Sequence, residues 1–158
     1  MLVGVEEIKI REARFDEPAV QRLIAEAMAE LSRRYGGTGD DTPVAVTDFA
    51  PPSGAFLVAY ATAGDQLLGC AGWRAHGEDA ELKRMFTVPA ARGRGVARRV
   101  LAAIEESARE RGCKRVILET GDRQPEAIAL YLSCGYERID DFGYYKGEEG
   151  VLSYARSL

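Results

Sequence analysis

The sequence of 158 residues has one histidine, His76, and three well-separated cysteines, Cys70, Cys113 and Cys134. A single histidine excludes a metal site built on two imidazoles of one chain, and a nucleophile paired with histidine would have to use His76. A glycine follows His76 between two apolar runs, so we expect a turn there. An odd number of cysteines that lie far apart in the sequence is typical of reduced thiols in a cytoplasmic protein, not of a disulfide framework or a zinc site.

Long apolar runs are missing as well. No run reaches the roughly 18 residues of a membrane span, and the start, MLVGVEEIKI, lacks the basic segment of a secretion signal. The 21 basic and 25 acidic side chains give a net charge of −4, which argues against a protein that coats nucleic acid. With 46% hydrophobic and 29% charged residues, the composition predicts a single folded domain over residues 1–158, with neither membrane nor nucleic acid as partner.

The spacing of apolar residues predicts an alternation of strands and helices. Strands are expected at 5–13, 56–61, 67–74, 80–88, 115–120, 136–139 and 151–156, and helices at 18–35, 95–112 and 125–135. The stretch 36–54 is rich in glycine and proline and has no period, so we expect a long loop with one helical turn, of a length that is often functional. This order predicts an α/β protein with a mixed sheet.

A glycine-rich turn, PAARGRGVA at residues 89–97, joins a predicted strand to a predicted helix. The helix starts near Gly95 without a Ser, Thr, Asp or Asn to cap it, and Gly93 and Gly95 let a ligand approach the backbone closely. Between Leu82 and Ile104 there are six basic residues and no acidic one. Unsatisfied N–H groups and local positive charge together favour a bound phosphate.

Two other interpretations of this turn stay open on the residues alone. Water would also satisfy the free N–H groups at the helix start, and the arginines would then form a solvated face. Short glycine patterns are common, so the residues alone do not decide between water and a bound phosphate. A dinucleotide site of the G-x-G-x-x-G type fits less well. Arg98 stands at the third glycine position, where helix and strand must pack closely.

The segment Arg92-Gly-Arg-Gly-Val-Ala97 resembles the R/Q-x-x-G-x-G/A signature of the GNAT N-acetyltransferases, an acetyl-CoA-dependent superfamily. Residues 80–88, followed by proline, look like the strand before that signature. Ala129-Leu-Tyr-Leu-Ser-Cys-Gly-Tyr136 is similar to the family's A-L-Y-x-x-x-G-F/Y segment. The resemblance implies a GNAT-like fold, a mixed and mostly antiparallel sheet of six to seven strands flanked by helices. It also implies transfer of the acetyl group of acetyl-CoA to a primary amine by direct attack in a ternary complex.

The resemblance further implies where acetyl-CoA would bind as co-substrate. The pyrophosphate of CoA would lie on the signature turn, made of Arg92, Gly93, Arg94, Gly95, Val96 and Ala97, with Arg98 at its edge. The pantetheine arm would pair with backbone groups of Phe86 and Val88, on a strand that splays from the next parallel strand. Gln124 stands where many members carry an asparagine, which implies a CoA contact through a longer arm.

Acetyl transfer to an amine requires proton movement. An amine with a pKa of about 10 is almost fully protonated at pH 7, and a departing thiolate with a pKa of about 8.5 benefits from a proton donor. The resemblance implies Tyr131 as the donor and Glu81 as the base. Glu81 would alternatively form an ion pair with Lys83 or Arg84. Glu119, on the next strand, is a second candidate base, and a chain of waters is a third.

The acceptor, a small-molecule amine or a peptide, is expected to bind between the loop 36–54 and the segment 142–145. Asp40, Asp41 and Asp48 would suit a cationic amine, unless they are simply solvated. A covalent route through Cys134 lacks a histidine partner. A module that binds acyl-CoA without catalysis is the alternative function, and it would not need Tyr131. Homodimers are frequent in the family, and we expect the strand 151–156 to be an edge at which two copies would meet.

Overall fold

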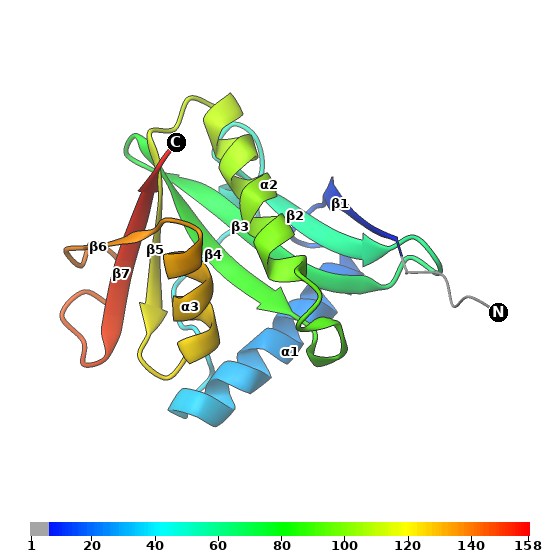
Figure 1. The fold of residues 1–158 in the computed structure, drawn as a ribbon, viewed down its shortest axis with the longest axis horizontal. Helices are drawn as coiled ribbons and strands as arrows, with labels where there is room; N and C mark the ends of the chain where they lie inside the picture. The colour runs from blue at the N-terminus through cyan, green and yellow to red at the C-terminus, as the bar shows by residue number, and fades with distance from the viewer. Residues whose placement is uncertain (1–6) are drawn as a thin grey trace.

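The computed structural model describes residues 7–158, and the predicted start of the first strand, at Val5, lies outside them. These residues form one seven-stranded sheet in the order β1-β2-β3-β4-β5-β7-β6 (Figure 1). The strands are β1 (Ile8–Glu12), β2 (Gly54–Ala61), β3 (Leu67–His76), β4 (Asp79–Thr87), β5 (Arg115–Gly121), β6 (Glu137–Ile139) and β7 (Val151–Ser157). The helices are α1 (Pro18–Tyr35), α2 (Val96–Glu110) and α3 (Pro125–Ser133), with short 3-10 helices η1 (Val46–Phe49) and η2 (Pro89–Ala91).

The predicted fold class is confirmed. All neighbouring strands pair antiparallel except β4 and β5, which are parallel. Each predicted strand and helix is present with bounds that differ by a few residues, and the loop 36–54 carries one helical turn, η1. His76 is the last residue of β3, directly before the expected turn, and its ring lies 5.4 Å from that of Phe142.

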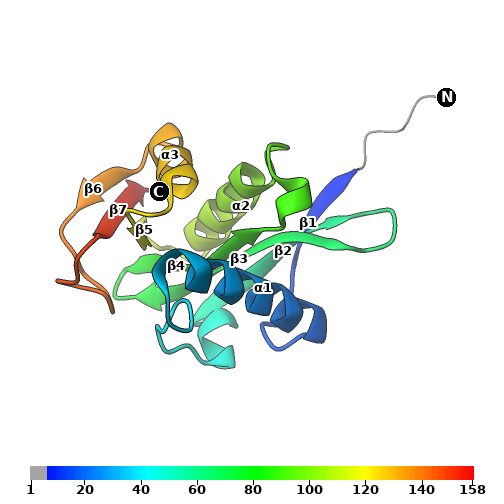
Figure 2. The same cartoon turned by 90° about the horizontal axis from the view of Figure 1, so that it is seen from below.

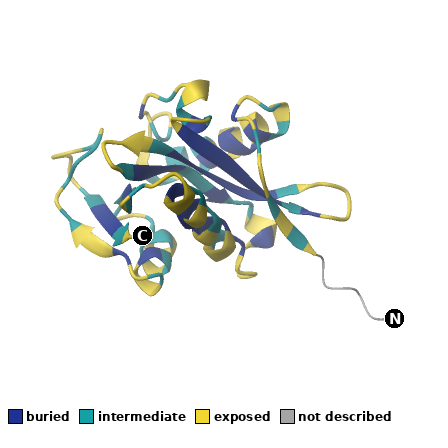
Figure 3. Ribbon diagram, turned by 90° about the horizontal axis from the view of Figure 1, so that it is seen from above, coloured by how far each residue is buried: buried dark blue, intermediate teal, exposed yellow. Residues whose placement is uncertain are grey.

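Helices cover both faces of the sheet, and the alternation of side chains along the strands supplies a core to each face. Figure 2 shows α2 and α3 on one face and α1, with η1, on the other. Along β2, Leu57 and Ala59 belong to the core on the α2 side, whereas Phe56 and Val58 belong to the core on the α1 side. The central strands are therefore buried on both faces (Figure 3).

The sheet opens between β4 and β5. Their pairing is confined to Ala80 with Val116 and Glu81 with Ile117, after which the strands diverge (Figure 1). In the same region the register between β3 and β4 shifts, so that an extra residue of β4 is accommodated, and Arg84 adopts a φ of 59°. A bulge of this kind bends a strand and increases its twist. The splay that the resemblance implies is thus present.

The prediction that the strand 151–156 forms an edge of the sheet is wrong. β7 lies between two strands, because Ala155 pairs with Ile117 of β5 on one side and with Glu137 of β6 on the other. Within residues 7–158 the outer strands of the sheet are β1 and β6. The sequence pattern predicted the strand 151–156 correctly, but the short β6 folds back to cover it.

Candidate active site

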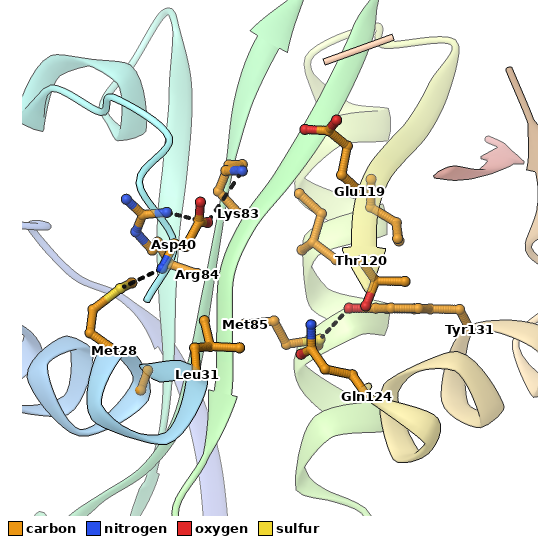
Figure 4. A pocket seen from close by; sticks show the side chains of 13 residues that line it. Met28, Leu31, Asp40, Lys83, Arg84, Met85, Glu119, Thr120, Gln124 and Tyr131 are labelled. Atoms are coloured by element: carbon orange, nitrogen blue, oxygen red, sulfur yellow. Dashed lines mark hydrogen bonds and ion pairs between the residues drawn. The ribbon is translucent and has the colours of Figure 1, made fainter. Parts of the chain in front are cut away.

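Three cavities follow one another along the opening between β4 and β5. The turn groove lies beside the start of α2 and has a volume of about 500 Å³. The central cavity, of about 90 Å³, lies between the two strands (Figure 4). The outer pocket, of about 370 Å³, lies against the end of α1 and the loop 140–150. Gln124 lines all three; Met85 and Tyr131 line the first two, and Lys83 and Glu119 line the last two.

The turn groove presents backbone N–H groups. Gly95 is the N-cap of α2 with φ 78°, and within residues 7–158 no side chain caps this helix. Gly93 also has φ 78°, and a Cβ added at Gly93 or Gly95 would meet nothing within 4 Å. The space beside the turn is therefore open to a ligand. An uncapped helix start that faces such a space is suited to a phosphate group.

The signature residues line this groove, apart from Arg94. The lining includes Arg92, Gly93, Gly95, Val96, Ala97 and Arg98. The guanidinium of Arg92 already has a partner, since its Nη2 lies 2.7 and 2.9 Å from the two carboxylate oxygens of Glu30 on α1. Its Nε donates to the carbonyl of Thr87 at 3.1 Å. Before any ligand binds, the backbone of the turn is thus the more available anion donor.

Arg98 is held at the other side of the groove, against the end of α3. Its Nη2 donates to Ser133 Oγ at 2.7 Å and its Nη1 to Cys134 Sγ at 3.2 Å. These contacts place Arg98 at the edge of the groove, as expected. Cys134 itself lines none of the three cavities.

The backbone of Val88 is not available in the way the sequence led us to expect. Its amide donates to the carbonyl of Leu68 at 2.9 Å, and its carbonyl accepts from the amide of Ala91 at 3.0 Å. Phe86 does line the groove, and so does Thr87, which the sequence analysis missed. The reason is that the Val88 amide continues the ladder between β3 and β4, while its carbonyl accepts the first hydrogen bond of η2.

Tyr131 enters the central cavity from α3. The side chain is buried, and its hydroxyl lies 3.7 Å from the Sδ of Met85 on β4 (Figure 4). The rings of Tyr136 and Tyr154 pack beside it, with centroids 5.7 and 6.5 Å away. Burial raises the pKa of Tyr131 well above its ordinary value, because the charged phenolate is poorly solvated there. The hydroxyl therefore keeps its proton.

Glu81 is not in the lining of the three cavities. It is buried against Arg74 of β3, whose Nε donates to its Oε1 at 2.9 Å. The alternative of an ion pair between Glu81 and Lys83 or Arg84 is wrong, since both cations bind Asp40. Arg74 and Glu81 are directly opposite in the register of β3 and β4, so they are closer than residues two apart on one strand.

Glu119 of β5 lines the central cavity and the outer pocket. Its Oε2 accepts the backbone N–H of Tyr145 at 3.1 Å, whereas its Oε1 is buried and has no hydrogen-bond partner within residues 7–158. Burial raises the pKa of Glu119 above its ordinary value. A carboxylate with a raised pKa and an unused oxygen is suited to accept a proton.

Asp40, on the loop 36–54, sits between the cations of β4. Its Oδ2 lies 3.4 Å from Lys83 Nζ and also binds Arg84, while its Oδ1 accepts from Thr42 Oγ1 at 2.6 Å and from the hydroxyl of Tyr145 at 2.7 Å. Burial alone would raise the pKa of Asp40, but Lys83, Thr42 and Arg84 outweigh it and lower the pKa to about 2. Asp40 is therefore a structural anion at neutral pH.

The outer pocket combines carboxylates with aromatic side chains. Its lining includes Asp40, Asp41, Glu119, Glu148, Glu149, Tyr35 and Tyr145. Asp48, the third expected loop aspartate, instead binds Arg74 at 3.1 Å. Of the expected segment 142–145 only Tyr145 lines the pocket, whereas Tyr144 is half exposed outside it. The glutamates of the sequence KGEEG and the end of α1 were missed, although adjacent acidic residues in a glycine-rich turn were a visible signal.

Comparison with known proteins identifies the family. The model of the acetyltransferase (GNAT) family matches residues 23–136, so the chain belongs to the GNAT acetyltransferases. An IAA acetyltransferase of Azospirillum brasilense is 34% identical over 132 residues, which cover 82% of this chain and 86% of that protein. The uncharacterised N-acetyltransferase YjgM of Escherichia coli K12 is 35% identical over 138 residues, covering 79% and 78%.

Solved structures agree with the assignment. A Klebsiella pneumoniae protein described as an acyl-CoA N-acyltransferase has a TM-score of 0.79 and 27% identity, covering 96% of this chain and 97% of that one. Other structures of this fold hold acetyl-CoA or coenzyme A. The chain is an acetyl-CoA-dependent N-acetyltransferase, which confirms the sequence prediction of the family, the reaction and the co-substrate. Among residues 7–158, no helix has both the length and the apolarity needed to cross a bilayer.

Proposed function

We propose that this enzyme acetylates a primary amine of a molecule that carries a further positive charge, with Glu119 as general base and Tyr131 as general acid. One observation carries the proposal: Glu119 and Tyr131 both line the central cavity, one where it meets the outer pocket and the other where it meets the turn groove. An acceptor in the outer pocket and an acetyl donor in the turn groove would therefore meet between them.

The turn groove would bind the diphosphate of acetyl-CoA through the N–H groups of residues 93–97. The open space at Gly93 and Gly95 and the uncapped start of α2 support this assignment. Gln124 and Met85, which line both the groove and the central cavity, would contact the arm that leads to the thioester. Arg98 would contribute positive charge at the edge.

The proton transfers follow from the environments of the two side chains. Glu119 would accept the proton that the amine must lose before it attacks, since its raised pKa brings a carboxylate closer to neutral pH. Tyr131 would donate a hydrogen bond, and then its proton, to the sulfur as negative charge develops. Its own pKa is raised by burial, so the hydroxyl is available over the whole physiological range.

Direct attack on the thioester is favoured over a cysteine intermediate. Burial raises the pKa of Cys70 to about 12, and this thiol lines none of the three cavities. Cys134 lies outside them too, against Arg98. A thiol nucleophile must be accessible and ionised. None of the three cysteines lines one of these cavities, which favours the amine as the attacking group.

The charges of the outer pocket point to a cationic acceptor. Asp41, Glu119, Glu148 and Glu149 line it, and its one lysine, Lys83, is paired with Asp40. A volume of about 370 Å³ accommodates a small diamine or a single lysine side chain of a peptide. A second ammonium group would be attracted by the outer carboxylates while the first reaches Glu119.

The test is an acceptor series read out by release of free CoA thiol. We expect 1,5-diaminopentane to have a lower KM than pentylamine, which has the same length but lacks the second charge. Replacing both Glu148 and Glu149 by Gln should raise the KM of the diamine by about three- to tenfold and leave that of pentylamine unchanged, given the usual strength of exposed ion pairs. Glu119→Gln should lower kcat for both amines.

A matched control is the double variant Glu106→Gln and Glu110→Gln on α2, whose side chains line none of the three cavities. It should leave every KM unchanged. Equal KM values for the two amines in the wild type would contradict the cationic acceptor. Full activity of Glu119→Gln would contradict the assignment of the base.

Two further predictions concern the location of the protein in the cell and its oligomeric state. The three cysteines are free thiols, in keeping with the proposed cytoplasmic location. A homodimer also stays a prediction, and β1 and β6 are the strands whose edges would be available for it. Light scattering on the purified enzyme would give its mass.

A further inference from the structure

A chain of side-chain contacts joins β4 to β5 across the outer end of the opening. From β4, Lys83 and Arg84 bind Oδ2 of Asp40. Oδ1 of Asp40 accepts from the hydroxyl of Tyr145 at 2.7 Å, and the backbone N–H of Tyr145 donates to Oε2 of Glu119 at 3.1 Å. Figure 4 shows Lys83 with Asp40 on one side of the cavity and Glu119 on the other.

These contacts replace strand pairing that is absent here. β4 and β5 share backbone pairing only at Ala80–Val116 and Glu81–Ile117. Glu119 lies two residues beyond, where β4 has already turned away. Its orientation therefore depends on β7, its other neighbour in the sheet, and on Tyr145, which holds one carboxylate oxygen.

Tyr145 is held at its hydroxyl and at its backbone N–H. Its hydroxyl donates to Asp40 and also accepts the backbone N–H of Asp41 at 2.7 Å. Asp40 in turn has contacts to both oxygens, two of them from the buried side chains of Lys83 and Arg84. A tyrosine whose hydroxyl both donates and accepts is held in one orientation, and this anchors the loop segment whose backbone N–H at Tyr145 reaches Glu119.

We propose that Asp40 and Tyr145 are positioning residues that hold Glu119 in place for proton transfer. The inference rests on the proposed role of Glu119 as the base. Neither residue needs to touch the reacting atoms, since both act through the orientation of the Glu119 carboxylate and the charge that faces it.

The charges around Glu119 give the two residues opposite effects on pH dependence. Lys83 and Glu81 face it from β4, Asp40 and Tyr145 from the loops, and the register partner on β7 is the neutral Ser153. Without the charge of Asp40, Lys83 stabilises the Glu119 carboxylate more strongly, which moves its titration to lower pH. Without the hydroxyl of Tyr145, the hydrogen bond from its backbone N–H to the Glu119 carboxylate weakens, which moves the titration of Glu119 to higher pH.

The experiment measures kcat against pH at saturating acetyl-CoA and amine, by thiol release. The variants are Tyr145→Phe, Asp40→Asn and Glu119→Gln. Tyr144→Phe is the matched control, because this neighbouring tyrosine packs its ring 5.0 Å from that of Tyr145 and lies outside the pocket lining. We expect Tyr145→Phe to lower kcat about tenfold, which is less than the roughly hundredfold cost of a 1 Å misplacement, because β7 still holds the backbone of Glu119. The acidic limb of the kcat–pH profile of Tyr145→Phe should move to higher pH, and that of Asp40→Asn should move to lower pH. In both variants the KM of acetyl-CoA should stay within twofold of the wild type.

Each outcome decides a different point. The inference is overturned if Tyr145→Phe has the kcat and the acidic limb of Tyr144→Phe while Glu119→Gln has lost that limb. An acidic limb that persists in Glu119→Gln overturns the proposed base, and the positioning inference with it. Should Asp40→Asn fail to give the wild-type circular dichroism spectrum, Tyr145→Phe and its control still decide.

Discussion

Arg74 Nε donates to Glu81 Oε1 at 2.9 Å, directly across β3 and β4. The same guanidinium binds Asp48 at 3.1 Å and the carbonyl of Pro43 at 2.8 Å. Arg74 therefore fastens the loop 36–54 to the sheet at the point where β4 and β5 begin to part. The carboxylate that the family resemblance implied as a base is, in this chain, part of that attachment.

The first prediction separates the two glutamates. Glu81→Gln should lower the free energy of unfolding by about 2 kcal/mol, because the half-buried guanidinium of Arg74 loses the buried one of its two carboxylate partners. Its kcat should stay within about threefold of the wild type, since Glu81 lines none of the three cavities. Urea unfolding and thiol release measure the two quantities. Glu78→Gln, at an exposed ion pair with Lys114, is the control for stability. A large loss of kcat with unchanged stability would restore Glu81 as a base.

The second prediction concerns Tyr131. Tyr131→Phe should lower kcat by about a hundredfold, the lower range for general acid catalysis. The KM of acetyl-CoA should change little, because the ring and its packing against Tyr136 and Tyr154 are kept. Since burial raises the pKa of Tyr131, the wild type should show no basic limb from this group below pH 10. Unchanged turnover in the variant would remove the hydroxyl of Tyr131 from the mechanism.

The third prediction is a dependence of stability on acid. The pKa of Asp40 is about 2 in the folded protein, against an ordinary value of 3.8. A lowered folded-state pKa stabilises the protein above the unfolded-state value, and this stabilisation is lost as the pH falls from about 4 to about 2. It amounts to about 2 kcal/mol. The difference in unfolding free energy between the wild type and Asp40→Asn should shrink by that amount over this window. Asp65→Asn, in an exposed turn, should show no comparable change.

Local patterns were sufficient to predict much of the fold. Glycines at 93 and 95 and the missing cap define the start of α2, because both features are properties of a few consecutive residues. The register of β3 and β4 was also within reach. A two-residue turn, Gly77 and Glu78, sets His76 opposite Asp79, and counting back along the strands sets Arg74 opposite Glu81. That count would have identified the partner of Glu81.

The outer half of the site could not be predicted in the same way. The opening of the sheet depends on a bulge at which Arg84 adopts φ 59°, a conformation that its residue type does not favour. The position of Asp40 depends on the path of a long irregular loop, and that of Tyr145 on a second loop that is 105 residues away in sequence. Contacts between two loops depend on the whole fold, so residue types alone indicated only an acidic and aromatic pocket.

The last prediction concerns the ion pair between Glu30 and Arg92. Glu30 lines the turn groove, and its Oε1 accepts a hydrogen bond from Arg92 Nη2 at 2.7 Å. The Glu30 carboxylate therefore competes with a bound diphosphate for the guanidinium of Arg92. Glu30→Gln should therefore tighten the binding of CoA by about two- to fivefold at low salt, the scale of one half-exposed ion pair. The gain should shrink as the ionic strength rises.

Isothermal titration with CoA at two salt concentrations would measure this effect. Glu26→Gln, one turn earlier on α1 and exposed, is the matched control and should leave the affinity unchanged. Weaker binding of CoA by Glu30→Gln would mean that Glu30 orients Arg92 toward the ligand and does not compete with it. The sign of the change thus distinguishes a competing carboxylate from a supporting one, because both hypotheses predict a change and only its direction differs.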